Sequence, residues 1–196
     1  MKKHTDHVDI LLANAGATWG APFDEHPDDG FAKVMDLNVN SVFTTIREFA
    51  PLLEKRASLD DPSRVLITAS VAGLGVGMLG STATFGYSAS KAAAVSLARN
   101  LGVDLVPRGI TVNALCPGFF PTKMTKGTMD VAGEDTMAAM NPQGRLGRPE
   151  DFAGAVVFLC SRAGGHVNAE ALAIDGGGRW ASGELMNTGG ALASKL

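Results

Sequence analysis

The sequence lacks the features of several classes of protein. No apolar run approaches the roughly 18 residues that a membrane span needs, so we expect no membrane-spanning helix. A block of basic charge is also missing: 17 Lys and Arg residues stand against 20 Asp and Glu residues, which predicts no nucleic-acid partner. The short apolar stretch from Val8 to Ala13 runs directly into Asn14-Ala15-Gly16, without the cleavage site of a secretory signal peptide.

Cysteine and histidine are scarce. The two cysteines, Cys116 and Cys160, are far apart and each lies in an apolar segment, which predicts buried, reduced thiols. Of the four histidines only His4 and His7 are close together, and neither has a cysteine or a third ligand at a zinc-like spacing. The sequence therefore predicts no metal site.

Short aliphatic runs alternate with longer segments of helical spacing. The runs are apolar almost throughout, as in strands buried on both faces of a parallel sheet. The alternation predicts an α/β domain with right-handed crossovers, and 196 residues are enough for one such domain. The predicted strands are Val8–Leu12, Arg64–Thr68, Ile110–Leu115 and Ala171–Ile174, and the main predicted helices are Val42–Leu53, Tyr87–Leu105 and Phe152–Cys160, the last opened by Pro149.

Tyr87 and Lys91 are the strongest catalytic candidates. They are four residues apart, so on a helix the phenol and the ammonium share a face about one turn apart. A free tyrosine has a pKa of about 10, too high for proton transfer at neutral pH. A nearby lysine favours the phenolate and lowers that pKa, so the pair predicts a general acid/base.

Small and polar residues follow the ends of three predicted strands. Ligands of an open α/β sheet bind beyond the carboxyl ends of its strands, and a hydroxyl there can donate a hydrogen bond to a substrate carbonyl. The alternative to this hydrogen-bonding role is that Ser70 only caps or turns the chain. Asn38, taken alone, is an ordinary polar residue of a helix. The segments are Asn14-Ala15-Gly16 after Val8–Leu12, Ser70 after Arg64–Thr68, and Pro117-Gly118 after Ile110–Leu115.

Together these residues resemble the short-chain dehydrogenase/reductase family. The motifs occur in the family's order, span Val8 to Gly178 and are highly specific in combination. The resemblance implies a Rossmann-like, doubly wound parallel sheet in one domain over residues 1–178, followed by a flexible tail over residues 179–196. The motifs are Asn14-Ala15-Gly16, Asn38-Val39, Ser70, Tyr87-x-x-x-Lys91, Asn113 with Pro117-Gly118, and Asp175-Gly176-Gly177.

The resemblance also implies an activity, the interconversion of a ketone and a secondary alcohol with NADP or NAD, of which NADP is favoured. Tyr87 would be the general acid, Lys91 would lower its pKa and hold the nicotinamide ribose, and Ser70 would orient the carbonyl. Asn38 would hold a water of a proton relay behind Lys91. The cofactor-binding residues that the resemblance implies are Asn14, Ala15, Gly16, Tyr87, Lys91, Pro117, Gly118, Phe120 and Thr122.

The sequence departs from the family pattern in two places. A complete member begins with a strand and a Gly-rich turn that seats the pyrophosphate on a helix N-terminus, whereas this chain begins just before the family's fourth strand. We therefore expect a partial fold without the first strands and that turn, with Val8–Leu12 exposed at a sheet edge. Ser70 and Tyr87 are also unusually far apart, which indicates an insertion within Leu74–Thr84 and makes Ser81 an alternative to Ser70.

The loops Ala17–Pro22 and Phe119–Thr125 are similar to those of the 3-oxoacyl reductases of rhamnolipid synthesis. This similarity implies a 3-oxoacyl thioester substrate, carried by CoA or acyl carrier protein. The Met-rich segment Met124–Met140 is expected to be either a lid over an acyl chain or a plain surface helix. A sugar or polyol reductase is the alternative within the family.

A second alternative is a catalytically silent chain that associates with a full-length relative. The family forms tetramers through the helices that correspond to Val42–Leu53 and Tyr87–Leu105, so a homodimer or homotetramer is also expected for this chain.

The chain ends in Ser194-Lys195-Leu196, which is a peroxisomal import address that a receptor recognises. This ending predicts a peroxisomal protein with the import receptor as a partner, and a cytoplasmic location is the alternative.

Overall fold

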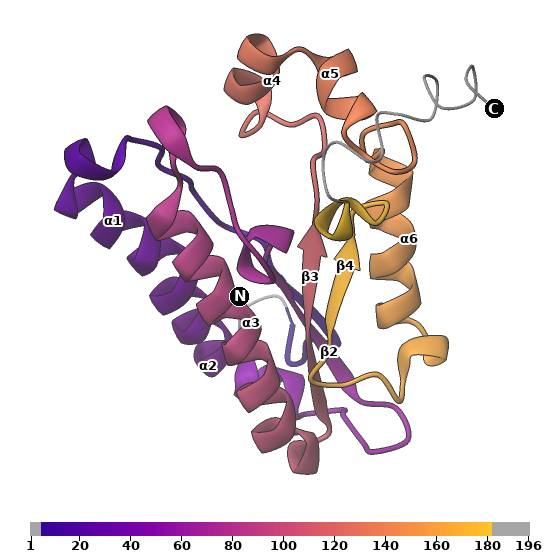
Figure 1. The fold of residues 1–196 in the computed structure, drawn as a ribbon. Helices are drawn as coiled ribbons and strands as arrows, with labels where there is room; N and C mark the ends of the chain where they lie inside the picture. Colours follow the sequence, from indigo (N-terminus) through magenta and orange to yellow (C-terminus); the bar gives the residue numbers. More distant parts are fainter. Residues whose placement is uncertain (1–4, 182–196) are drawn as a thin grey trace.

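The computed structural model describes residues 5–181, apart from the side chain of Val131. Within this range four parallel strands form one sheet, in the spatial order β1-β2-β3-β4 (Figure 1). Because every crossover returns to the same end of the sheet, all four strands present their carboxyl ends at one edge. The strands are β1 (Ile10–Ala13), β2 (Ser63–Thr68), β3 (Ile110–Pro117) and β4 (Ala171–Ile174).

Helices cover both faces of the sheet, α2 and α3 on one side and α6 on the other (Figure 1). Along β2 the side chains alternate, so that Val65 and Ile67 pack in the cluster under α2 and α3 while Leu66 packs against α6. The short helices α4 and α5 lie beyond the carboxyl end of β3 (Figure 1). The helices are α1 (Asp28–Met35), α2 (Ser41–Leu53), α3 (Phe85–Leu105), α4 (Lys126–Ala132), α5 (Glu134–Ala139) and α6 (Pro149–Cys160), with a π-helical turn over Asp36–Asn40.

The predicted α/β sheet is confirmed, and each predicted strand overlaps an observed one with ends that differ by at most two residues. The helices predicted at Val42–Leu53 and Tyr87–Leu105 are α2 and α3, and Pro149 opens α6 as predicted. The Met-rich segment forms two short helices because Gly133 interrupts it at a φ of 80°. Helix α1 was not predicted from the sequence.

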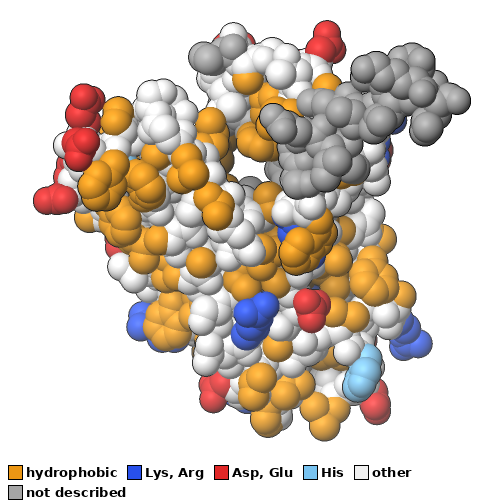
Figure 2. Space-filling model, in the orientation of Figure 1, with side chains coloured by type: hydrophobic (Ala, Val, Ile, Leu, Met, Phe, Trp, Pro, Cys, Tyr) orange, Lys and Arg blue, Asp and Glu red, His pale blue; other side chains and the backbone are white. Residues whose placement is uncertain are grey.

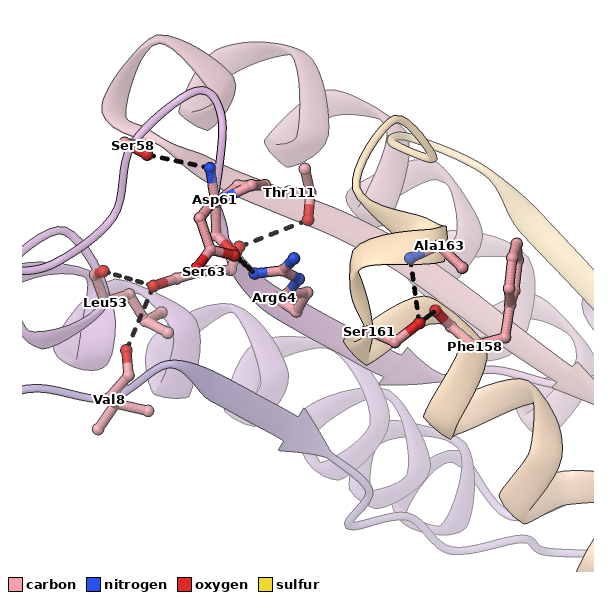
Figure 3. Close-up of polar contacts among 11 residues, drawn as sticks. Val8, Leu53, Ser58, Asp61, Ser63, Arg64, Thr111, Phe158, Ser161 and Ala163 are labelled. Atoms are coloured by element: carbon pink, nitrogen blue, oxygen red, sulfur yellow. Dashed lines mark hydrogen bonds and ion pairs between the residues drawn. The ribbon is translucent and has the colours of Figure 1, made fainter.

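Hydrogen bonds at the amino end of the sheet join the start of β2 to the segments around it (Figure 3). The buried Ser63 hydroxyl donates to the Leu53 carbonyl at 2.7 Å, which joins the start of β2 to the end of α2. The Arg64 guanidinium, which is also buried, donates to the Asp61 carboxylate at 2.8 Å. These contacts anchor the first residues of β2 at the amino end of the sheet.

Strand β1 pairs only with β2 among the described residues, so its other side is a sheet edge, as predicted. Ile10 and Leu12 are 50% and 40% exposed on this strand.

Both cysteine thiols are free, and Cys116 is buried while Cys160 is partly buried. No helix between residues 5 and 181 is long and apolar enough to span a bilayer.

The C-terminal segment differs from the prediction at its start. Gly178–Trp180 forms a 3-10 turn instead of beginning a flexible tail, because the Asp175 carboxylate accepts hydrogen bonds from the backbone N–H groups of Gly177 and Arg179, both at 3.0 Å. The rest of the predicted tail, including Ser194-Lys195-Leu196, lies outside the described residues.

Candidate active site

The predicted site residues gather at the carboxyl edge of the sheet. Asn14 follows β1, Ser70 follows β2 and Gly118 follows β3, so the parallel strands bring three distant segments to one edge. Tyr87 and Lys91 lie in the first two turns of α3, which packs across β2 and β3 on the same side as α2. The tertiary fold therefore brings together the catalytic residues that the sequence predicted.

Lys91 is buried at the centre of this cluster. Its ammonium donates a hydrogen bond of 2.7 Å to the carbonyl of Thr68, the last residue of β2, and only 4% of the residue is exposed. The ammonium also lies 5.5 Å from the centroid of the Tyr87 ring, a distance at which the ring attracts the cation. Lys91 thus connects the end of the central strand to the catalytic helix.

Burial shifts the pKa values of both Lys91 and Tyr87. Desolvation lowers the pKa of Lys91 from 10.5 to about 8. Desolvation also raises the pKa of Tyr87, and the neighbouring Ser70 hydroxyl lowers it only in part. Lys91 is not among the causes of this shift, and its predicted effect on the pKa of Tyr87 stays a prediction. Its ammonium is bonded to Thr68 and faces the tyrosine ring, so burial determines the pKa of the phenol.

Ser70 suits the catalytic position better than Ser81. Ser70 is buried at the end of β2, where its hydroxyl caps the following 3-10 turn by accepting from Ala72 N at 3.2 Å. Its hydroxyl is also close enough to Tyr87 to lower the pKa of that phenol. Ser81 is exposed in a separate 3-10 turn, Gly80–Thr82. The capping role and the proximity to Tyr87 are both found at Ser70.

Asn38 is almost completely buried, in the π-helical turn, and its side chain is occupied by protein groups. Its Oδ1 accepts from Ala17 N at 2.9 Å, and its Nδ2 donates to Ala17 O at 2.9 Å and to Ser90 Oγ at 2.8 Å. The side chain therefore holds the loop after β1, and the predicted role of Asn38 in holding a water stays a prediction. Sequence reasoning missed Ser90, whose only signal was its place beside Lys91 in the Tyr87–Lys91 motif.

The predicted cofactor residues after β1 present polar groups and exposed backbone at the same edge. Asn14 and Ala15 are exposed, and Asn14 Oδ1 accepts from Thr68 Oγ1 at 2.9 Å. Gly16 lies against Asn38 and Lys91, since a Cβ built on it would be 3.3 Å from Asn38 Oδ1 and 3.4 Å from Lys91 Nζ. Only a very small residue leaves this approach between the loop and Lys91 open.

The predicted cofactor residues after β3 lie in different surroundings. Pro117 and Gly118 are half-buried at the end of the strand and Thr122 is exposed. The ring of Phe120 packs beside Gly147 and lies 6.2 Å from the Phe152 ring of α6. The side chain of Phe120 thus fastens the loop to α6, and its predicted contact with a nicotinamide stays a prediction.

A polar cavity of about 290 Å³ lies next to this loop, beyond β4. Asn141 bridges it by donating to Asp175 O at 2.7 Å, and Arg145 forms a bidentate ion pair with Asp151 at 2.6 and 3.1 Å. The charged groups of this cavity are therefore already paired within the chain. Over residues 5–181 no three His, Cys, Asp or Glu side chains are grouped to hold a metal ion.

Substitution of Gly73 tests how closely the loop that follows Ser70 packs against α3. A Cβ on Gly73 would lie 2.6 Å from the backbone N of Ala92, next to Lys91, whereas a Cβ on Gly75 would meet nothing nearer than Val71 O at 4.0 Å. We expect Gly73→Ala to lower the free energy of unfolding by about 1–3 kcal/mol, since the loop must move away from the helix. Gly75→Ala is the matched control and is expected to change it by less than about 1 kcal/mol. Chemical denaturation of both variants checks this, and equal effects would contradict it.

Comparison with known protein families and structures gives a consistent result. The model of the family described as enoyl-(acyl carrier protein) reductase matches residues 1–178. The chain is 42% identical over 171 residues to the rhamnolipids biosynthesis 3-oxoacyl-[acyl-carrier-protein] reductase of Pseudomonas aeruginosa, covering 87% of this chain and 66% of that protein. It is 38% identical over 172 residues to a 2-dehydro-3-deoxy-D-gluconate 5-dehydrogenase of Pseudoalteromonas atlantica, covering 87% of this chain and 64% of that protein. The chain thus spans just under two thirds of the length of these two relatives.

Solved structures agree in fold. The Pseudomonas aeruginosa RhlG/NADP active-site complex superimposes with a TM-score of 0.83 at 40% identity, covering 91% of this chain and 69% of that one. A gluconate 5-dehydrogenase from Burkholderia cenocepacia, in complex with NADP and tartrate, superimposes with a TM-score of 0.81 at 29% identity, covering 92% of this chain and 68% of that one.

Proposed function

This chain belongs to the short-chain dehydrogenase/reductase family, and we propose that it acts in an NAD(P)-dependent interconversion of a ketone and a secondary alcohol. The proposed direction and substrate are the reduction of a 3-oxoacyl thioester, with NADP as the favoured cofactor. One observation carries the proposal: the buried ammonium of Lys91 lies beside Tyr87 and the strand-end hydroxyl of Ser70, at the carboxyl edge of a parallel sheet.

The residues at this edge fit a dinucleotide, with Asn14, Ala15 and Gly16 proposed on the adenosine-ribose side and Lys91 at the nicotinamide ribose. Asn14, Lys91 and Thr122 offer hydrogen-bonding groups, and Gly16 leaves the backbone open beside the Lys91 ammonium. Ala15, Pro117 and Gly118 would border the bound group, as the family resemblance implies. When bound, such a cofactor supplies the hydride, and the chain supplies position and a proton.

Tyr87 is the proposed proton donor to the carbonyl oxygen. Burial raises the pKa of Tyr87, so the phenol carries throughout the neutral range the proton that it would give to the carbonyl oxygen. Ser70, at the end of β2, is placed to donate a second hydrogen bond to the same oxygen. Lys91 is charged below its pKa of about 8, so its ammonium favours the negative charge that develops on the phenol as the proton leaves.

The surroundings of the site support an apolar substrate. The loop between β2 and α3 carries the exposed side chains of Val76 and Leu79, and its Met78 Sδ lies 3.9 Å from Thr128 Oγ1 of α4. Phe119 is also exposed, on the loop after β3. Hydrophobic side chains border the hollow in the upper half of Figure 2. These segments suit an acyl chain better than a polyhydroxylated sugar.

A sugar or polyol reductase is the second candidate within the family. Its support is the similarity to the 2-dehydro-3-deoxy-D-gluconate 5-dehydrogenase. The third candidate is a silent chain that associates with a longer relative. The groove of about 260 Å³ between α2 and α3, lined by Phe43, Leu101 and Leu105 among others, is the surface we propose for association in either case, including a homodimer or homotetramer. Import through Ser194-Lys195-Leu196 and the cytoplasmic alternative both stay predictions.

Titration of the purified 196-residue chain with NADPH and NADH tests the cofactor. A ligand that binds only the native state stabilises it by about 2.7 kcal/mol at a hundredfold excess over its Kd, so the melting temperature is expected to rise with NADPH concentration. Oxidation of NADPH is then followed at equal concentrations of a 3-oxoacyl-CoA and a ketose. We expect turnover of the thioester. Faster turnover of the ketose would favour the second candidate, and a folded chain without any cofactor effect would favour the third.

A further inference from the structure

Ser90 stands in a buried chain of hydrogen bonds that crosses three segments. It is completely buried in α3, and its hydroxyl donates to the Tyr87 carbonyl at 2.7 Å. The same oxygen accepts from Asn38 Nδ2 at 2.8 Å, a contact between residues 52 positions apart. Asn38 in turn bonds both the N–H and the C=O of Ala17, in the loop after β1. One hydroxyl thus joins the catalytic helix, the π-helical turn and this loop.

The direction of each hydrogen bond follows from the chemistry of the groups. The backbone N–H of Ala17 can only donate, so the Asn38 atom facing it must be the carbonyl oxygen. The amide nitrogen is then directed to Ala17 O and Ser90 Oγ, and both of its protons are used. Ser90 Oγ accepts one of these protons and gives its own to Tyr87 O. A reversed Asn38 amide would place two donors against each other at Ala17.

We propose that Ser90 is a positioning residue, which holds the Asn38 amide in the orientation that clamps Ala17 and thereby keeps the Asn14–Ala17 loop against Lys91. The closeness of this loop to the catalytic centre supports the proposal, since a Cβ on Gly16 would be 3.4 Å from Lys91 Nζ. The expected effect on cofactor binding rests on the proposed function. The effect on the loop itself is independent of any activity.

A helix serine often donates to the carbonyl three or four residues before it, without any tertiary role. The bond from Ser90 to Tyr87 has this local form, so it alone would not assign a role. The bond accepted from Asn38 is what separates Ser90 from such a serine, because removing the hydroxyl leaves a buried amide proton of Asn38 without its acceptor. The consequence should appear at Ala17, on the far side of Asn38.

The test compares Ser90→Ala with Ser88→Ala. Ser88 is two residues earlier in the same helix, and its buried hydroxyl has no hydrogen-bond partner within the described chain, so its removal breaks no hydrogen bond. Amide hydrogen exchange at Ala17 N–H, followed by NMR in the full 196-residue chain, is expected to become at least about tenfold faster in Ser90→Ala and to stay unchanged in Ser88→Ala. Should Ser90→Ala fail to fold, Ser90→Cys, of similar size and with a weaker donor, serves in its place.

Unchanged exchange at Ala17 in the Ser90 variant, or equal acceleration in both variants, would overturn the proposal. Where the chain binds NADPH, Ser90→Ala is expected to raise the KM for NADPH by a larger factor than it lowers kcat, because the loop and not the proton donor is displaced. If neither form of the chain binds a cofactor, the proposed function fails while the exchange experiment still decides the role of Ser90.

Discussion

Tyr87→Phe is expected to lower the rate of carbonyl reduction by about 10²–10⁴-fold, the usual contribution of a positioned proton donor. The variant keeps the aromatic ring that faces the Lys91 ammonium, so the packing of α3 against β2 is preserved. The Kd for NADPH, measured by titration, should therefore rise by a much smaller factor than kcat falls. A variant that keeps the full rate would exclude Tyr87 as the proton donor.

The two serine candidates provide the control for this experiment. Ser70→Ala removes the hydroxyl that lies beside the phenol, and we expect its rate to fall together with that of Tyr87→Phe. Ser81→Ala changes an exposed hydroxyl in the Gly80–Thr82 turn and should keep the wild-type rate.

Because Tyr87 is the only tyrosine of the chain, its ionisation can be followed directly by ultraviolet absorbance. That titration should place its pKa above 10, since burial raises it.

Lys91→Met is expected to lower turnover about 10²-fold, as for the loss of other groups that stabilise developing negative charge.

The same variant should change how the free energy of unfolding depends on pH. The pKa of Lys91 falls from 10.5 to about 8 on folding, so between these values the unfolded chain binds more protons than the native one. Stability must then rise with pH across this window. Integration of this difference from pH 7 to pH 9 gives a gain of about 1 kcal/mol in the wild type.

At higher pH another buried group acts in the opposite direction. Burial raises the pKa of Cys116 from 9.0 to about 11, so the unfolded chain loses that proton first, and above about pH 9 this loss offsets most of the gain from Lys91. Urea unfolding at pH 7, 8 and 9 should show a rising free energy of unfolding for the wild type and a flatter course for Lys91→Met. Lys33→Met, an exposed lysine paired with Asp29, is the control and should keep the wild-type slope. Equal slopes in all three proteins would contradict a buried, charged Lys91.

The secondary structure could be predicted from the sequence because its signals are local. Continuous apolar runs such as Ile110–Leu115 are typical of strands buried on both faces, and Pro149 marks the first turn of α6. The spacing of Tyr87 and Lys91 placed the phenol and the ammonium on one helix face for the same reason. Parallel strands also imply one shared carboxyl edge, so the place of the site followed from the strand order alone.

The tertiary structure decided what those side chains do, because it determines burial and contacts between distant segments. The Lys91 ammonium bonds to the Thr68 carbonyl, 23 positions away, and desolvation raises the pKa of Tyr87 and lowers that of Lys91. Phe120 packs on α6 for a similar reason. The bond between Asn38 and Ser90 spans 52 positions, and no local pattern encodes such a pair. Residue types and their spacing determined which side chains are candidates for the site, whereas packing determined the burial and the hydrogen-bond partners of each group.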